Sequence, residues 1–399
     1  MRIGMLADAY KPHISGVTNY IALNKKYLEE RGHEVYVFTF MYEDYQDDEK
    51  NVIRSQGLPF FNTGLYFSVN YSKEARKLLS SMDIAHVNHP FFTGSLVMAY
   101  CRPRKIPIVF TNHTRYDLYA QAYVPAMPEI VSLKALQAYL PRFCRYCDRV
   151  ISPSPGMKVV LRNLGVDVRI DVIPNGVDLE PFKAEATLTR TDVGFQPDDK
   201  LLIYVGRLGP EKNLPFLLRA FAGVIQVNDR ARLILLGDGP ERENLEDQVE
   251  NAGLKNKVRF TGLIPYDQVA SYMAIADAFV SASYTEVHPL TVIEAMAAGL
   301  PVLGIASPGV SDTVIPGETG YLVEKDDLEG FRTKMIELVM NEEDRQRLGR
   351  NASVEVERYS IQNTVHLLEQ LYLDVLEQAG RREHGFKPWI TQKLEKLRI

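Results

Sequence analysis

Two glutamates eight positions apart, Glu286 and Glu294, carry the strongest chemical signal in the sequence. Glu286 lies in a polar loop after a short apolar run at 278–281, and Glu294 lies one turn into a helix that Pro289 opens. Both carboxylates therefore frame one helix N-terminus. Such a terminus suits a diphosphate, and carboxylate oxygens suit sugar hydroxyls, so the pattern indicates a nucleotide-sugar site. Taken alone, the same pair also fits an ordinary helix start with acidic residues near its dipole.

A second stretch, residues 205–213, supplies positive charge. Arg207 and Lys212 follow the carboxyl end of a strand-like apolar run. Sugar transfer from a nucleoside diphosphate places negative charge on the leaving diphosphate, which nearby cations stabilise. The sequence contains no Asp-x-Asp triplet, the usual anchor for a divalent metal. We therefore expect no metal and no other cofactor, with Arg207, Lys212 and the helix N-terminus at Leu290 and Thr291 carrying the charge instead.

Two residues in the first half of the chain are further candidates. Gly16 stands at the entry of a predicted helix, where glycine allows close approach of the backbone to a bound group. His113 follows a strand-like run at 108–111. A single histidine is more often structural, but ligands of doubly wound sheets bind beyond the carboxyl ends of the strands. His113 is therefore a candidate for the reaction centre.

Short apolar runs alternate with amphipathic stretches along the chain, which indicates parallel sheets with helices on both faces. We expect two doubly wound α/β domains, 1–180 and 181–379, that face each other across a cleft. A turn-rich segment at 173–181 and a polar linker separate them, and residues beyond 341 are predicted to be helical. Strands are expected at 3–7, 35–39, 84–87, 108–111, 150–152 and 170–173, and then at 201–205, 233–236, 258–260, 278–280, 302–304 and 321–323.

Composition narrows the class of protein. The chain has 399 residues, 46% of them hydrophobic, which is enough for two cores, and its net charge of −5 argues against a nucleic-acid binder. Cys101, Cys144 and Cys147 are too few for a disulfide framework and indicate a reducing compartment; we interpret the C-x-x-C pair as packing. The sequence shows no signal peptide and no apolar run of membrane-spanning length. A cytoplasmic location is expected.

The segment from Glu286 to Val302 resembles the Glu-x7-Glu signature of retaining glycosyltransferases of the GT-B fold, in particular family 4, and the likeness covers nearly the whole chain. The resemblance implies two Rossmann-like domains, the first for the acceptor and the second for the nucleotide sugar. It also implies that a C-terminal helix crosses back to the first domain, here at about residues 380–399. Many members have Phe-Gly where this chain has His288 and Pro289, and paired glycines where it has Ser15-Gly16.

The resemblance also implies roles for the candidate residues. Glu294 would bind the ribose hydroxyls, and Glu286 the hydroxyls of the transferred sugar. His113 would lie beside that sugar and stabilise the transition state by a hydrogen bond, without acting as a nucleophile. The remaining donor contacts, with the diphosphate, would come from Gly16, Arg207, Lys212, Leu290 and Thr291.

Segments 88–94 and 112–125 are similar to bacterial glucosyltransferases that act on diacylglycerol. This likeness implies transfer of a hexose, glucose from UDP-glucose, to a lipid hydroxyl by a peripheral enzyme on the inner face of the cell membrane. A predicted helix at 130–149 with Lys134, Arg142, Arg145 and Arg149 fits an anionic membrane surface, and it equally fits a core helix with a solvated basic side.

Two alternatives stay open. Related subfamilies use other acceptors, such as phosphatidylinositol, a small thiol precursor or a polysaccharide, in some cases with GDP-mannose as the donor. A catalytically silent protein that binds nucleotide sugars would keep the fold without the activity. The presence of all the candidate site residues argues against the silent protein.

Overall fold

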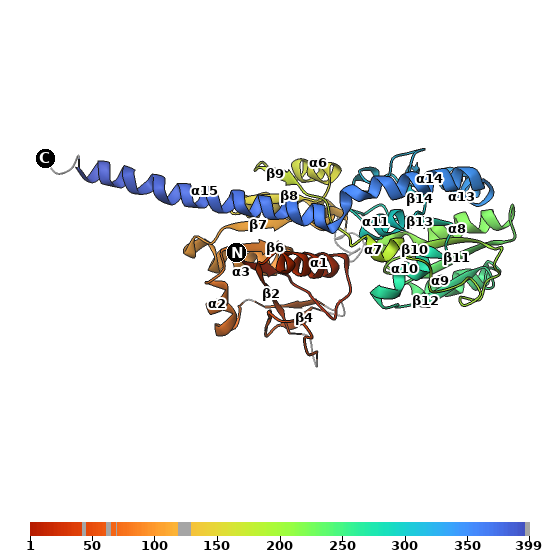
Figure 1. Ribbon diagram of the computed structural model, residues 1–399, viewed down its shortest axis with the longest axis horizontal. Coiled ribbons are helices and arrows are strands. Elements are labelled where there is room, and N and C mark those ends of the chain that lie inside the picture. Colours follow the sequence, from red (N-terminus) through yellow and green to blue (C-terminus); the bar gives the residue numbers. More distant parts are fainter. Residues whose placement is uncertain (42–44, 61–64, 69, 119–128, 396–399) are drawn as a thin grey trace.

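The computed structural model describes residues 1–41, 45–60, 65–68, 70–118 and 129–395. Two parallel sheets form two units that lie side by side (Figure 1), and the predicted doubly wound α/β architecture is confirmed. The first sheet has the order β3-β2-β1-β6-β7-β8-β9. Its strands are β1 (Arg2–Leu6), β2 (Glu34–Phe40), β3 (Val52–Ser55), β6 (Ile84–Val87), β7 (Ile108–Thr111), β8 (Arg149–Ser152) and β9 (Ile170–Val172).

The second sheet has six parallel strands in the order β12-β11-β10-β13-β14-β15. In both sheets the strand order reverses beside the first strand of the unit, which is the switch point where such folds bind ligands. The strands of the second sheet are β10 (Lys200–Val205), β11 (Ala231–Leu236), β12 (Val258–Gly262), β13 (Ala278–Ser281), β14 (Val302–Ile305) and β15 (Gly320–Val323).

Helices cover both faces of each sheet, because the strands are apolar on both sides and each face must be buried. The first unit contains α1 (Gly16–Glu30), α2 (Lys73–Leu79), α3 (Phe92–Tyr100), η1 (Arg102–Arg104), α5 (Glu129–Cys144) and α6 (Pro155–Asn163). The second contains α7 (Glu180–Lys183), η2 (Pro210–Lys212), α8 (Leu214–Ile225), α9 (Arg242–Asn251), α10 (Tyr266–Ala274), α11 (Leu290–Ala297), α12 (Pro308–Ser311), α13 (Leu328–Met340), α14 (Glu342–Glu355) and η3 (Val356–Tyr359).

Three strands were not predicted. β3 extends the edge of the first sheet, and β4 (Leu58–Phe60) pairs antiparallel with β5 (Leu65–Phe67) in a separate ribbon. These strands have only three or four residues each, so the local apolar pattern did not distinguish them from loop.

The predicted helix at 130–149 is shorter than expected, since α5 ends at Cys144. Arg149 begins β8 instead and is buried. Its guanidinium donates to Gln378 Oε1 at 2.6 Å and pairs with Asp171 at 3.6 Å. The expectation that Arg149 belongs to a basic helix surface is therefore wrong, because strand pairing places this side chain inside the molecule.

The last helix, α15 (Ile361–Glu395), returns to the first unit and runs across it (Figure 1). We predicted that the return begins at about residue 380, but it begins at Ile361. Glu369 accepts hydrogen bonds from Arg31 at 3.0 Å and contacts His33 Nε2 at 2.8 Å. Apolar side chains at helical spacing join the core of the first unit: Ile361, Val365, Leu368, Leu371, Tyr372 and Val375.

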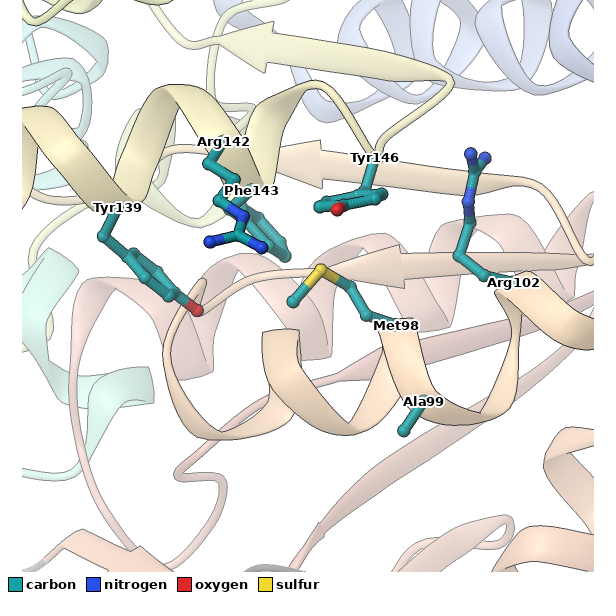
Figure 2. A pocket seen from close by; sticks show the side chains of 7 residues that line it. All are labelled: Met98, Ala99, Arg102, Tyr139, Arg142, Phe143 and Tyr146. Atoms are coloured by element: carbon teal, nitrogen blue, oxygen red, sulfur yellow. The ribbon is translucent and has the colours of Figure 1, made fainter.

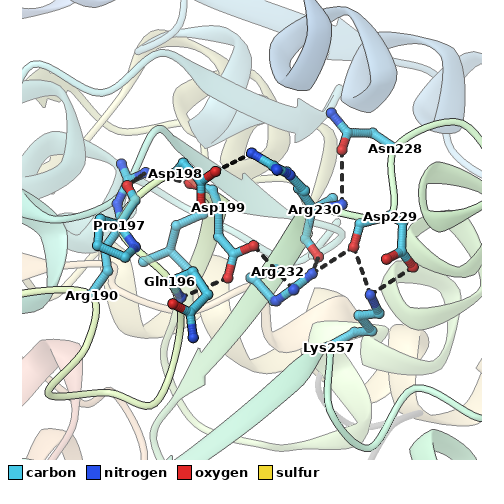
Figure 3. Close-up of polar contacts among 12 residues, drawn as sticks. Arg190, Gln196, Pro197, Asp198, Asp199, Asn228, Asp229, Arg230, Arg232 and Lys257 are labelled. Atoms are coloured by element: carbon cyan, nitrogen blue, oxygen red, sulfur yellow. Dashed lines mark hydrogen bonds and ion pairs between the residues drawn. The ribbon is translucent and has the colours of Figure 1, made fainter.

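Ion pairs hold the polar linker against the amino ends of strands in the second sheet (Figure 3). Arg190 donates to the Ile275 carbonyl at 3.0 Å and pairs with Asp277 at the same distance. Asp199, which is almost fully buried, pairs with Arg232 of β11 at 3.0 Å. The linker is therefore part of the second unit.

Across the described ranges, no helix is both long enough and apolar enough to cross a membrane.

Candidate active site

The candidate residues lie at the carboxyl ends of strands in both sheets. Glu286 follows β13, Lys212 follows β10 and His113 follows β7. The two units approach each other at these ends, since Ser154 Oγ donates to the carbonyl of Val287 at 3.1 Å across the boundary. Burial lowers the pKa of His13, and the charge of Arg207 on the opposite unit lowers it further. The structure thus brings the loops of both units together around one site.

Lys212 and Glu286 form an ion pair within this site. Lys212 Nζ lies 2.7 Å from Glu286 Oε1, and both side chains are mostly buried. Burial opposes ionisation of Glu286, but the charge and hydrogen bond of Lys212 bring the pKa of this carboxyl below its usual value. Burial likewise opposes charge on Lys212, and Glu286 raises its pKa overall. Both groups are therefore charged at neutral pH.

Glu294 lies on α11 and is only 2% exposed. Tyr266 Oη, at the start of α10, donates to Glu294 Oε1 at 2.8 Å. Burial raises the pKa of Glu294 to about 7, against the smaller effect of this hydrogen bond, which lowers it. The carboxyl therefore titrates near neutral pH. Sequence reasoning missed Tyr266, because no local pattern relates a tyrosine after β12 to a glutamate on α11.

The N-terminus of α11 lies between the two glutamates in the chain and has no side-chain cap. Pro289 occupies the N-cap position and provides no side-chain cap. The N–H groups of Val292 and Ile293 both bond the Pro289 carbonyl, at 3.2 and 3.3 Å. Leu290 and Thr291, the first residues of the helix, thus present their backbone at the terminus, where the helix dipole favours an anion.

His288 contacts residues of the connection between the units. Its ring packs against Tyr359 of η3 with centroids 5.0 Å apart, and its carbonyl accepts from Asn175 at 2.9 Å. Burial lowers its pKa to about 3, with a further contribution from the charge of Arg358. A neutral, buried ring in this position packs the connection between the units and contributes no charge to the site.

His113 is held in one orientation. Its Nε2 lies 3.0 Å from Asn88 Oδ1, and its ring packs against Tyr20 with centroids 4.5 Å apart. The Asn88 amide nitrogen donates to the carbonyls of Leu6 and His86, both at 3.4 Å, so its oxygen faces His113 and Nε2 is the donor. Burial lowers the pKa of His113 well below its usual value, and neighbouring histidines add to this. The ring is neutral at pH 7.

Gly16 is the first residue of α1, preceded by the N-cap Ser15, whose hydroxyl accepts from Thr18 N at 3.1 Å. A Cβ added at Gly16 would meet no atom within 4 Å. Packing therefore does not require glycine here, and the space above this backbone is free of protein.

Comparison with known families decides the class of protein. The model described as "Glycosyltransferase Family 4" matches residues 14–181, and "Glycosyl transferases group 1" matches residues 186–354. The chain belongs to the GT-B glycosyltransferases of family 4. The expected enzyme class is thereby confirmed.

This glycosyltransferase is similar to the alpha-monoglucosyldiacylglycerol synthase of Streptococcus pneumoniae, with 33% identity over 79% of this chain and 73% of that protein. The synthase of the same name from Acholeplasma laidlawii is 28% identical over 96% of this chain and 99% of its own. Among solved structures, sucrose-phosphate synthase from Thermosynechococcus elongatus superposes with a TM-score of 0.79 at 24% identity, covering 94% of this chain and 99% of that one. The last comparison bears on the fold alone.

The glycosyltransferase has two further polar residues at the same edge of the first sheet. Asp8 follows β1, accepts a hydrogen bond from Thr93 N at 2.8 Å and donates its own N–H to His89 Nδ1 at 3.1 Å. Burial raises the pKa of Asp8, and the charge effect of His89 lowers it in part. Sequence reasoning did not single out Asp8. Its place after the first strand, opposite His89 after β6, was the signal available.

Within the part of the glycosyltransferase that the structure describes, no three His, Cys, Asp or Glu side chains converge as metal ligands. The three cysteines are thiols, two of them fully buried. Burial raises the pKa of Cys144 to about 12 and that of Cys147 well above its usual value. These thiols are protonated at neutral pH, in line with a packing role.

Proposed function

We propose that this glycosyltransferase transfers glucose from UDP-glucose to the hydroxyl of a membrane lipid such as diacylglycerol, with retention of anomeric configuration. The observation that carries the proposal is the grouping of the Lys212–Glu286 pair and the buried Glu294 around the N-terminus of α11. This grouping combines cationic donors for a diphosphate with carboxylate acceptors for hydroxyls. The names of the relatives, glucosyldiacylglycerol synthases, support glucose and a lipid acceptor.

On the donor side, Glu294 accepts hydrogen bonds from the ribose and Glu286 from the hexose. Lys212, together with Arg207 and the backbone at Leu290 and Thr291, holds the diphosphate. Gly16 contributes its backbone from the first unit, where an added Cβ would meet no atom within 4 Å. This arrangement stabilises the charge that develops on the leaving group, which is the largest demand of the reaction.

For the chemical step we propose attack on the same face from which the leaving group departs. The bond between the anomeric carbon and the phosphate oxygen breaks, and the lipid oxygen bonds to that carbon. The hydroxyl proton passes to the leaving phosphate oxygen, so the proposal requires no protein base. Neutral His113, oriented by Asn88, is suited to a hydrogen-bonding role beside the transferred sugar.

Replacement of His113 by alanine is expected to lower kcat by about 100-fold, because one positioned hydrogen bond to the transition state is lost. The Kd for UDP, measured by calorimetry, should change little, since all the proposed nucleotide contacts except that of Gly16 lie on the other unit. His366→Ala is the matched control, because His366 is an exposed histidine of α15. Equal turnover in wild type and His113→Ala would remove His113 from the catalytic residues.

We also propose that transfer requires no divalent metal, because Lys212, Arg207 and the α11 N-terminus already place positive charge at the diphosphate. Initial rates with excess EDTA should equal those without it. A loss of activity in EDTA that magnesium restores would contradict this prediction.

Attachment to the membrane surface is proposed through the exposed side of α5. Ile130 and Val131 are 67% and 54% exposed near its start, and Lys134 is exposed beside them. Apolar side chains with neighbouring cations suit an anionic bilayer surface, which would place the enzyme on the inner face of the cell membrane. Co-sedimentation with anionic liposomes but not with neutral ones is the expected result. No binding to either kind would remove this part of the proposal.

The decisive assay supplies radiolabelled UDP-glucose or GDP-mannose together with diacylglycerol, phosphatidylinositol or a soluble acceptor, and identifies the labelled product by mass spectrometry. A glucosylated diacylglycerol is the expected product. A mannosylated or non-lipid product would favour another family 4 activity. Binding of UDP without any product, and without donor hydrolysis, would favour a catalytically silent protein.

A further inference from the structure

A pocket of about 470 Å³ lies between α3 and the C-terminal half of α5, on the first unit (Figure 2). Its size and mostly apolar wall are typical of a small-molecule site. In Figure 2 the side chains of Tyr139 and Phe143 on α5 lie on the side that faces α3, and that of Met98 on α3 extends toward them. The residues that line this α3–α5 pocket are Met98, Ala99, Arg102, Tyr139, Arg142, Phe143 and Tyr146.

Two aromatic side chains in the wall of the pocket are held in place by contacts. Tyr139 Oη donates to the carbonyl of Pro90 at 2.7 Å, which fixes the ring. Phe143 is buried and meets Phe110 of the core edge to face, with centroids 5.1 Å apart. An apolar ligand would therefore enter a preformed space, with little cost for ordering the wall.

A row of aromatic rings connects the pocket with the active site. Tyr116, three residues after His113, meets Phe91 at 5.0 Å between centroids, and Phe91 stacks on Tyr139 at 5.5 Å. Phe91 is 38% exposed. An apolar surface thus runs from the loop of His113 to the pocket. Binding and transfer of a sugar do not require such an apolar surface.

Positive charge lies at the rim of the pocket. Arg102 and Arg142 are both exposed, and neither pairs with a carboxylate among the described residues. The Arg102 guanidinium lies over the ring of Tyr146, 5.9 Å from its centroid. Guanidinium groups above an apolar space complement a bilayer surface, where anionic headgroups lie above hydrocarbon.

We propose that the α3–α5 pocket holds one acyl chain of the lipid acceptor, with the acceptor hydroxyl at the loop of His113 and the chain lying along Phe91 and Tyr139. The proposal rests on the proposed function and names the part of the acceptor that the first unit recognises. Arg102 and Arg142 then meet the phosphates of neighbouring lipids at the rim. The pocket selects acceptors that have a long apolar chain.

Filling the pocket tests this assignment. Ala99 is exposed on α3 and lines the pocket, so Ala99→Trp places an indole there without overpacking the core. Ala138→Trp is the matched control, because Ala138 is an exposed alanine of α5 outside the lining. Each methylene kept from water contributes a factor of about four to affinity. Ala99→Trp should therefore raise the KM for dioleoylglycerol in mixed micelles by about 10–50-fold, and Ala138→Trp should not.

Turnover of 1,2-dibutyrylglycerol, whose chains are too short to reach the pocket, should be the same in both variants and in wild type. Wild type that glucosylates no diacylglycerol at all would contradict the proposed function. Wild type that does so, with Ala99→Trp no different from Ala138→Trp, would overturn the pocket assignment alone.

A second measurement does not depend on activity. A diacylglycerol with a photoreactive diazirine near the end of one chain should label peptides from α3 or from the C-terminal half of α5, and Ala99→Trp should reduce the label several-fold. Labelling confined to other parts of the protein would overturn the proposal.

Discussion

Replacement of Lys212 by alanine is expected to lower kcat for sugar transfer by about 10²–10³-fold. In the proposed mechanism the variant removes a preorganised cation from the place where the leaving diphosphate gains charge, and this is the usual cost of losing one such donor. It also leaves Glu286, 2.7 Å away in the native protein, without its partner. Only the hydrogen bond with Ser283 would then oppose the effect of burial on Glu286, and the pKa of this carboxyl would rise.

The measurement is kcat with saturating UDP-glucose and dioleoylglycerol. Lys255→Ala is the control, because Lys255 pairs with Glu250 at 3.0 Å in a largely exposed pair that is expected to contribute little. Lys212→Arg keeps the charge and should recover part of the rate. A loss of less than about tenfold in Lys212→Ala would show that the diphosphate charge is balanced elsewhere.

Replacement of Glu294 by glutamine should stabilise the free protein at alkaline pH. Burial raises the pKa of Glu294 from 4.5 to about 7 in the folded state. The folded protein therefore holds a proton that the unfolded chain releases, and stability falls as the pH rises from about 4.5 to about 7. Glutamine has no charge to bury and can still accept from Tyr266. At pH 8 the free energy of unfolding should be higher in the variant by about 3 kcal/mol.

Chemical denaturation without ligand at pH 5 and pH 8 measures this difference. Near pH 5 the two proteins should differ little, because Glu294 is then largely protonated in the folded state. Glu250→Gln, at an exposed position, serves as the control. Equal stability of wild type and Glu294→Gln at pH 8 would mean that the carboxyl is solvated and that its pKa is not raised.

The same variant should bind UDP about tenfold more weakly at pH 8, because a charged acceptor forms the stronger hydrogen bond to a ribose hydroxyl. In wild type, affinity should rise with pH through about 7 as Glu294 ionises, and in the variant it should not. Calorimetric titration with UDP at several pH values tests both statements. Together these results would mean that the protein retains a destabilising buried carboxyl for the sake of its ligand.

Much of the architecture was predictable from local pattern. Each of the twelve expected strands is present, because a strand buried on both faces by helices must be apolar throughout, and such runs are visible in the sequence. The two glutamates were likewise recognised from a local pattern. Their spacing around Pro289 places them on a loop and the helix that follows it, and the geometry of nine consecutive residues is largely local.

Other features depend on contacts between distant residues. The sequence pattern places Arg149 on a basic helix, but the structure places it in β8, which pairs with β7 and β9. The return of α15 at Ile361 depends on contacts with the first unit. One of them joins Arg31 and Glu369, which are more than 300 positions apart in the sequence. Local composition contains no information on either partner.

The sequence by itself determined two Rossmann-like units and the residue types of the proposed donor site, because burial and helix geometry act over short stretches of chain. Only the tertiary structure decided which of these residues share a charge or a proton: Lys212 with Glu286, Tyr266 with Glu294, and Asn88 with His113. The ionisation of a buried group depends on what surrounds it in space, and folding brings those neighbours from separate strands. The α3–α5 pocket has the same origin, since it exists only where two helices pack without filling the space between them.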